Sequence, residues 1–203
     1  IPYQGQTIAT GIFKHPVQGR RLLARVNLAG DGQGDLEAHG GPDKAVYAYS
    51  FDHYDYWKRE LARSDFVYGQ FGENFTVEGL REDEVHIGDV FRVGGAVVEV
   101  SQPRIPCFKL GIRMELAQFP KMFLGSLRTG FYLRVLEEGE VRAGDGIERV
   151  ALGAERLSVR EAVRLLYFDK TNVEGARKAL RIAALSPGWR ASFEQLVARM
   201  SAS

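Results

Sequence analysis

The sequence predicts an α+β fold that is mainly β, with a barrel-like body at residues 1–150 and a small all-α tail of three helices at residues 155–203. Of the 23 glycines only Gly175 and Gly188 follow residue 153, and of the seven prolines only Pro187 does so. Because glycine and proline mark turns, the body contains many short elements and the tail few. Numerous short strands favour a closed or curved barrel over a doubly wound sheet.

Strand-like runs separated by glycine turns dominate the body, at residues 22–28, 44–50, 74–78, 90–93, 96–101 and 131–136. The last run continues through Gly139 into residues 140–142, which predicts a hairpin. Two helical stretches interrupt the strands. One follows Asp52, a candidate cap, and the other carries apolar residues at helical spacing from Phe108 to Phe119.

The tail begins after a linker at residues 150–154 and contains three helix starts. Ser158 and Glu161 form a capping box, and Asn172 can cap a second helix from Val173 to about residue 184. Ser186 followed by Pro187 predicts the start of a third helix. This helix carries an apolar stripe, and we expect its first member, Trp189, to be buried.

Composition excludes several classes of protein. The single cysteine rules out an internal disulfide and fits a reducing, cytoplasmic location. No apolar run approaches the roughly 18 residues of a membrane span, and no signal peptide is recognisable, so we expect no membrane partner. The tail holds nine Lys and Arg against five Asp and Glu, and the net charge of the chain is +1. We therefore expect no nucleic-acid partner, since nucleic-acid-binding domains are usually far more basic.

Cys107 is the residue with the most informative surroundings. It follows a loop stiffened by Pro103 and Pro106, and it stands where a helix is predicted to begin. A helix N-terminus and the nearby cations Arg104 and Lys109 would stabilise a thiolate and lower the pKa of the thiol. The competing interpretation is a small buried cysteine that packs as a hydrophobe.

Two further segments contain candidate ligand-binding residues. His39, Gly40, Gly41 and Lys44 precede a strand, where paired glycines allow close approach of a ligand and the side chains could contact an anion. Asn74, in the segment Phe71-Gly72-Glu73-Asn74, could hydrogen-bond a ligand. The competing interpretation is a plain strand-entry turn with solvated charges for the first segment, and a residue that only completes a turn for Asn74.

Other motifs are absent or incomplete. The glycines around Asp31 do not form a dinucleotide loop, no phosphate loop occurs, and the alternating acids Asp31, Asp35 and Glu37 do not complete a calcium loop. The histidines lack local zinc spacing. A Cys–His hydrolase stays open, although no third, orienting group can be identified.

Five segments, in this order, resemble the MOSC family, the domain also found at the C-terminus of molybdenum cofactor sulfurases. They are residues 39–43, 71–74, 87–89, 100–107 and 139–145. The three-helix tail resembles the extension of the stand-alone bacterial branch of this family, the YiiM type. The resemblance implies a β-barrel-like domain that holds the pyranopterin molybdenum cofactor, with Cys107 as the ligand of molybdenum and the catalytic residue.

The resemblance also implies roles for other residues. Basic side chains would hold the phosphate of the cofactor, and the candidates are Lys14, His39, Lys44, Arg104 and Arg134, with Gly40 and Gly41 beside them. Asn74 could bond the pterin edge. The YiiM type is associated with the detoxification of N-hydroxylated base analogues such as hydroxylaminopurine, which implies a small N-hydroxylated substrate. No flavin or iron–sulfur motif occurs in the sequence, so a separate electron-donating reductase is expected as a partner.

Three functions follow as hypotheses. The first is a molybdenum-dependent oxidoreductase that reduces N-hydroxylated compounds to amines. The second is a carrier of the molybdenum cofactor or of sulfur, without turnover of its own. The third is a binding module that uses the basic three-helix tail on DNA or on a protein.

Overall fold

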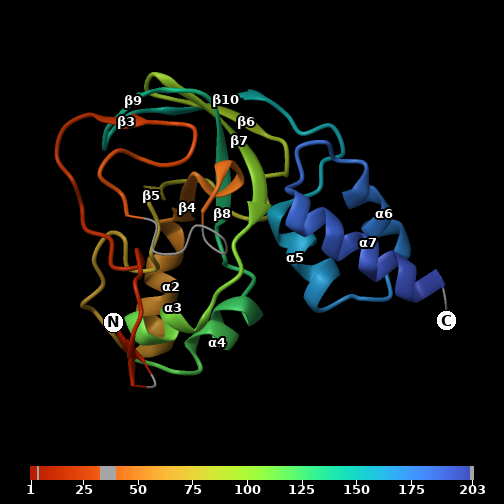
Figure 1. The fold of residues 1–203 in the computed structure, drawn as a ribbon, viewed down its shortest axis with the longest axis horizontal. Helices are drawn as coiled ribbons and strands as arrows, with labels where there is room; N and C mark the ends of the chain where they lie inside the picture. Colours follow the sequence, from red (N-terminus) through yellow and green to blue (C-terminus); the bar gives the residue numbers. More distant parts are fainter. Residues whose placement is uncertain (4, 33–39, 202–203) are drawn as a thin grey trace.

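The computed structural model of the chain describes residues 1–3, 5–32 and 40–201. A curled six-stranded sheet, a half-barrel, forms the centre of the body, and a three-helix tail packs beside it (Figure 1). The strand order is β10 (Ile147–Ala151), β6 (Val90–Val93), β7 (Ala96–Pro103), β8 (Phe131–Glu137), β4 (Val46–Ser50) and β5 (Phe75–Val77). Neighbouring strands are antiparallel except β4 and β5, which run parallel.

The central strands of the sheet are almost completely buried, and irregular pairing between two of them helps the sheet to curl. All five residues of β4 are buried, as are seven of the eight residues of β7. Strands covered on both faces lose the alternation of polar and apolar residues that a half-exposed strand shows. Two register shifts between β7 and β8, at Val97/Val98 and Val100/Gln102, mark irregularities that increase the local twist and help the sheet to curl.

The predicted hairpin at Gly139 is wrong. Both edges of β8 already pair, with β7 and β4, so the chain leaves the sheet after β8. Strand β9 (Gly139–Val141) pairs instead with β3 (Arg21–Leu23) in a separate two-stranded sheet. The run at 22–28 is therefore shorter than predicted, because the chain turns at residues 24–27 and brings Leu28 back to a bridge with Leu23. A further short pair, β1 (Pro2–Tyr3) and β2 (Gln6–Thr7), lies at the N-terminus.

Three helices lie below the sheet in the view of Figure 1. Helix α2 (Asp52–Leu61) buries Tyr54 and Trp57, and its N-cap is Phe51 rather than the predicted Asp52. The predicted helix from Phe108 is two helices, α3 (Phe108–Arg113) and α4 (Phe119–Gly125). A Schellman motif ends α3: Glu115 adopts a left-handed conformation with φ of 56°, and the N–H of Leu116 donates to the carbonyl of Gly111 at 2.9 Å.

The tail contains the three predicted helices, α5 (Val159–Tyr167), α6 (Val173–Leu180) and α7 (Pro187–Ser201). The Ser158 hydroxyl accepts a hydrogen bond from the N–H of Glu161 at 3.1 Å, as the capping box predicts. Helix α6 ends four residues before the predicted end. There the Arg190 guanidinium binds the carbonyls of Leu180 and Ile182, which satisfies groups that a longer helix would use.

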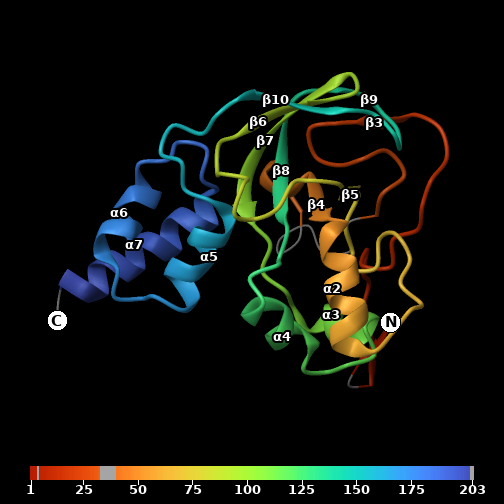
Figure 2. The ribbon, with the colours of Figure 1, turned by 180° about the vertical axis from the view of Figure 1, so that it is seen from behind.

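The tail and the sheet share one hydrophobic core. Val98 and Phe131 of the sheet and Leu165 and Phe193 of the tail belong to the same buried cluster. Trp189, 6% exposed, lies in it too, which confirms the expected burial. Backbone hydrogen bonds tie the two parts together, including Ser186 N–H to Ser101 O at 3.1 Å. Figure 2 shows the tail seated on the side of the sheet formed by β6 and β7.

A second, aromatic cluster lies between the sheet and helices α2 to α4. It contains Tyr49, Trp57, Phe71 and Phe123 among its fully buried members. None of the helices that the structure describes is both long and apolar enough to pass through a membrane.

Candidate functional site

A cavity of about 370 Å³ lies where the end of β7, the N-terminal segment and the tail meet. Its lining includes five of the predicted site residues: Lys14, Lys44, Asn74, Arg104 and Cys107. These come from positions far apart in the sequence. The cavity therefore brings together most of the side chains that the sequence suggested separately.

Cys107 is the N-cap of α3, in an extended conformation with φ −117° and ψ 174°. This confirms the prediction that a helix begins immediately after it. Strand β7 ends at Pro103, and Pro106 restricts the backbone directly before the cysteine. The thiol is half-buried in the cavity lining, so it is neither a fully enclosed core residue nor a surface residue.

Arg104 is a buried cation with spare hydrogen-bonding capacity. It is 6% exposed, and its guanidinium carbon lies 5.1 Å from the ring centre of Tyr47 and 5.2 Å from that of Phe123. Its Nη1 atom is buried and finds no hydrogen-bond partner in the part of the chain that the structure describes. A buried unsatisfied donor is costly, so an oxygen-rich ligand that accepts this hydrogen bond would relieve the cost.

The Arg104 guanidinium also affects its aromatic neighbours. Burial raises the pKa of Tyr132, and the positive charge of Arg104 partly opposes that shift. The pKa of Tyr47 is raised in the same way, with the same opposition. Both phenols therefore stay protonated at neutral pH and remain able to donate hydrogen bonds. The hydroxyl of Tyr47 donates to the carbonyl of Thr129 at 2.9 Å.

Cations outnumber acids in the lining. Lys14, Lys44, Arg104 and Lys109 are cationic, and Asp31 is the one carboxylate among the described lining residues. Asp31 is already engaged, because it pairs with Lys14 and accepts from Nδ2 of Asn74 at 2.7 Å. Lys109 is only 6% exposed and has no carboxylate within salt-bridge distance among the described residues. Among the described lining residues positive charges therefore outnumber negative ones, which favours an anionic ligand.

Asn74 is held at the cavity by a short loop. Its Oδ1 accepts from the N–H of Tyr47 at 3.0 Å. Gly72 has φ of +85°, and a Cβ there would lie 2.8 Å from the side chain of Ile12, so glycine is required. The buried carboxylate of Glu73 accepts hydrogen bonds from the N–H groups of Gly69 and Phe71. The Glu73 carboxylate therefore fixes the loop that presents Asn74.

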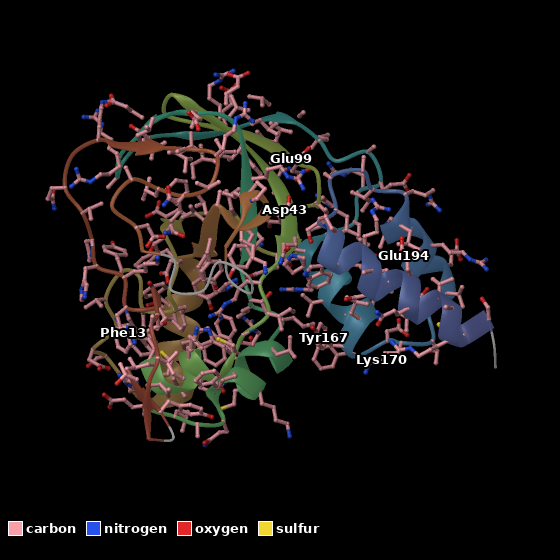
Figure 3. The ribbon with its side chains drawn as sticks, in the orientation of Figure 1. Phe13, Asp43, Glu99, Tyr167, Lys170 and Glu194 are labelled. Carbon is pink, nitrogen blue, oxygen red and sulfur yellow. The ribbon has the colours of Figure 1, made fainter. Side chains whose placement is uncertain are left out.

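The remaining predicted residues lie elsewhere. Arg134 is not among the described lining residues: it pairs with Asp43 and Glu99, and its Nη2 donates to the carbonyl of Ala184 at 3.2 Å. Asp43 and Glu99 lie close together beside the tail in Figure 3. The structure thus places Arg134 at the junction of body and tail rather than at the cavity.

The two predicted glycines also lie outside the lining. Gly41 adopts φ of 90° and begins the short helix η1 (Pro42–Lys44), which carries Lys44 to the cavity. Gly40 is half-buried beside it. His39 lies outside the described residues.

Several lining residues were not predicted from the sequence: Asp31, the body residues Tyr47, Gln102 and Tyr132, and the wall that the tail forms. Asp31 belonged to a pattern interpreted as a turn, and its N–H does form a turn hydrogen bond to the carbonyl of Leu28. The wall comes from the tail: Leu166 and Tyr167 at the end of α5, and Gly188, Trp189 and Ser192 in α7. In Figure 3 Tyr167 extends from the end of α5 toward the body. Only Trp189 had a signal, its apolar stripe, and that stripe predicted burial rather than a cavity.

Comparison with known proteins identifies the architecture. A sequence model of the MOSC domain matches residues 35–148. The chain belongs to the MOSC domain family. A second model, the YiiM-like 3-alpha helix domain, matches residues 157–199. This MOSC protein therefore has the same order of domains as the YiiM type, a MOSC domain followed by three helices.

Relatives of this MOSC protein match nearly its full length. YflK of Bacillus subtilis (strain 168) is 47% identical over 193 residues, covering 95% of this chain and 87% of YflK. The crystal structure of YiiM from Geobacillus stearothermophilus superposes with a TM-score of 0.83 at 35% identity, covering 92% of this chain and 89% of that one. A protein of Gibberella moniliformis (strain M3125 / FGSC 7600) named reductase is 32% identical over 165 residues. Those residues are 80% of this chain but 29% of that protein.

The MOSC family is associated with the molybdenum cofactor, and the described lining residues can be compared with what such a group would need. The unsatisfied Nη1 of Arg104 and the excess of cations suit a phosphate. The sulfur of Cys107 suits a soft metal. Among the described residues there is no group of three or more His, Cys, Asp or Glu side chains that could hold a metal ion.

Proposed function

We propose that this protein binds the pyranopterin molybdenum cofactor in the cavity and reduces N-hydroxylated compounds to amines. The observation that carries the proposal is a half-buried cysteine in the same cavity as a buried arginine with an unsatisfied Nη1 atom. Family membership supports the cofactor, and the relative named reductase supports the type of reaction.

Each described residue has a role in the proposal. Cys107 Sγ would ligate molybdenum, and Lys109 lies in the same lining. Arg104 Nη1 and the ammonium group of Lys44 would hold the phosphate. Asn74, fixed by Tyr47 and Asp31, would face the pterin edge. Lys14 would act mainly through Asp31, with which it pairs.

When bound, the molybdenum centre supplies oxygen-atom transfer coupled to two-electron redox chemistry. Reduction of an N–OH group takes two electrons and two protons, breaks the N–O bond and releases an amine and water. We propose that the electrons come from a separate reductase, in a reducing cytoplasm where the Cys107 thiol would persist. The relative named reductase is much longer than its matching segment, which leaves room in that protein for further domains.

The test combines metal content and turnover. Freshly purified protein should contain molybdenum at close to one atom per chain, and it should convert N-phenylhydroxylamine to aniline with reduced methyl viologen as the electron donor. Cys107→Ser replaces a soft thiolate with a hard, largely protonated hydroxyl, so this variant should fold and lose nearly all activity per bound molybdenum.

The matched control is Ser126→Ala, which changes a small polar side chain outside the described lining. Its activity per bound molybdenum should equal that of the wild type. Full activity in Cys107→Ser would falsify the ligand role. Stoichiometric molybdenum without any turnover would instead favour the cofactor carrier.

A further inference from the structure

The tail supplies a wall of the cavity that differs in chemistry from the rest of the lining. The α5–α7 wall consists of Leu166, Tyr167, Gly188, Trp189 and Ser192. None of these residues is charged, whereas all the charged lining residues that the structure describes come from the body. Ligand sites commonly combine a few polar contacts that fix orientation with apolar and aromatic walls that accept the remainder of the ligand.

The α7 part of this wall is fixed relative to Cys107. Trp189 packs into the shared core, with its ring centre 6.1 Å from that of Phe193. The first turn of α7 is tied to β7 through the hydrogen bond from Ser186 N–H to Ser101 O. Strand β7 leads directly into Arg104 and Cys107. The wall and the thiol are therefore positioned by the same strand.

Gly188 is the one member of the wall without a side chain, and packing does not require it to be glycine. It lies in the first turn of α7, and a Cβ built there meets no described atom within 4 Å. The other glycine of the tail helices contrasts with it, because a Cβ on Gly175 would lie 2.5 Å from Leu165 Cδ2. Since alanine forms helix more readily than glycine, folding alone would favour a larger residue at 188. Gly188 is exposed and belongs to the described lining of the cavity, so a side chain there would not have to displace packed atoms.

We propose that the α5–α7 wall is the specificity surface of the site and that Gly188 sets the size of the N-substituent that can reach Cys107. The inference rests on the proposed function. The charged groups of the body would hold the cofactor. The substituent of the substrate would lie against the uncharged wall, beside Tyr167 and Trp189, in the space that a side chain at 188 would fill.

The test varies residue 188 and substrate size together. Wild type, Gly188→Ala and Gly188→Leu are assayed with hydroxylamine, which has no substituent, and with N-phenylhydroxylamine. Gly188→Leu should lower kcat/KM for N-phenylhydroxylamine at least about tenfold and leave that for hydroxylamine within about twofold, with Gly188→Ala between the two. The matched control is Gly125→Leu, since Gly125 also lies in a helix, also has no described atom near its built Cβ, and is outside the described lining.

Equal losses for the two substrates would overturn the inference, because they would indicate damage to the cofactor site or to the fold. Unchanged kinetics for N-phenylhydroxylamine in Gly188→Leu would overturn it too. Circular dichroism checks the helix content of each variant. Gly188→Ala keeps the test decisive if the leucine variant fails to fold.

A binding measurement separates this inference from the proposed function. Aniline, the product, should quench the fluorescence of Trp189 in wild type and Gly125→Leu, and about tenfold more weakly in Gly188→Leu. The other tryptophan, Trp57, is buried in the aromatic cluster. If neither substrate is turned over but quenching still depends on residue 188, the proposed function is wrong, and the inference that the α5–α7 wall binds the substituent is supported. Absence of quenching in the wild type refutes the wall, whatever the turnover.

Discussion

Replacement of Arg104 by methionine should weaken cofactor binding far more than it weakens the fold. In the protein without cofactor, two ring contacts favour the guanidinium by about 0.5–2 kcal/mol each. The buried, unsatisfied Nη1 opposes this by about 1–3 kcal/mol. These contributions nearly cancel. Arg104→Met, which keeps an apolar stem over the rings, should therefore change the free energy of unfolding by less than about 2 kcal/mol.

The cofactor should respond differently. A hydrogen bond from a charged donor contributes about 1.5–3 kcal/mol, which corresponds to about 10- to 150-fold in affinity. Urea unfolding of the cofactor-free protein measures the stability, and the molybdenum retained after dialysis measures the affinity. Arg128→Met is the control, because Arg128 also lies over a ring, that of Tyr56 at 3.9 Å, but outside the described lining. A loss of stability above about 4 kcal/mol with full molybdenum content would show that Arg104 is a structural residue and refute this reasoning.

Two further predictions concern stability. Trp189→Ala should lower the free energy of unfolding by about 3–5 kcal/mol in urea, since the ring is buried in the shared core, and a loss below about 1 kcal/mol would contradict this burial. Burial raises the pKa of Glu73 above its ordinary value of 4.5, so the folded state holds this proton more tightly than the unfolded state does. The contribution of the protonated Glu73 side chain to the free energy of unfolding is fully present below pH 4.5, and it is lost as the pH rises through the raised pKa of the folded state. Urea titrations across this range should therefore show a fall in stability that Glu73→Gln lacks, and parallel profiles would count against it.

Local signals predicted the fold best. The capping box at Ser158, the cap at Asn172 and the Pro187 start each depend on a few adjacent residues, and each begins a helix in the structure. Predictions that depended on backbone conformation or on residues far away in the sequence were wrong. The apolar stripe through Phe108 and Leu116 continues past a Schellman motif, because periodicity does not record the left-handed backbone of Glu115. The partner of β9 is β3, more than a hundred residues away, rather than the adjacent β8.

The residues of the candidate site also fall into two groups, those with a local signal in the sequence and those without one. Cys107 and Arg104 could be found because prolines and charges surround them in the sequence. Arg134 was predicted from its charge, but Asp43 and Glu99 engage that charge at the junction with the tail. Gly188 and Tyr167 had no signal at all. Their place in the lining depends on how the tail packs against β7, a tertiary contact that no local pattern encodes.

The core shared by sheet and tail has a consequence for the evolution of this architecture. Two family models divide the sequence near residue 150, as if the tail were a module that recombination could add or remove. The hydrophobic cluster has no such boundary, since Val98, Phe131, Leu165 and Phe193 pack together. Loss of the tail would expose the apolar side of the sheet and open the cavity at once. The buried cluster therefore crosses the boundary between the two family models, so a tail exchanged for another would have to supply matching apolar side chains to the sheet.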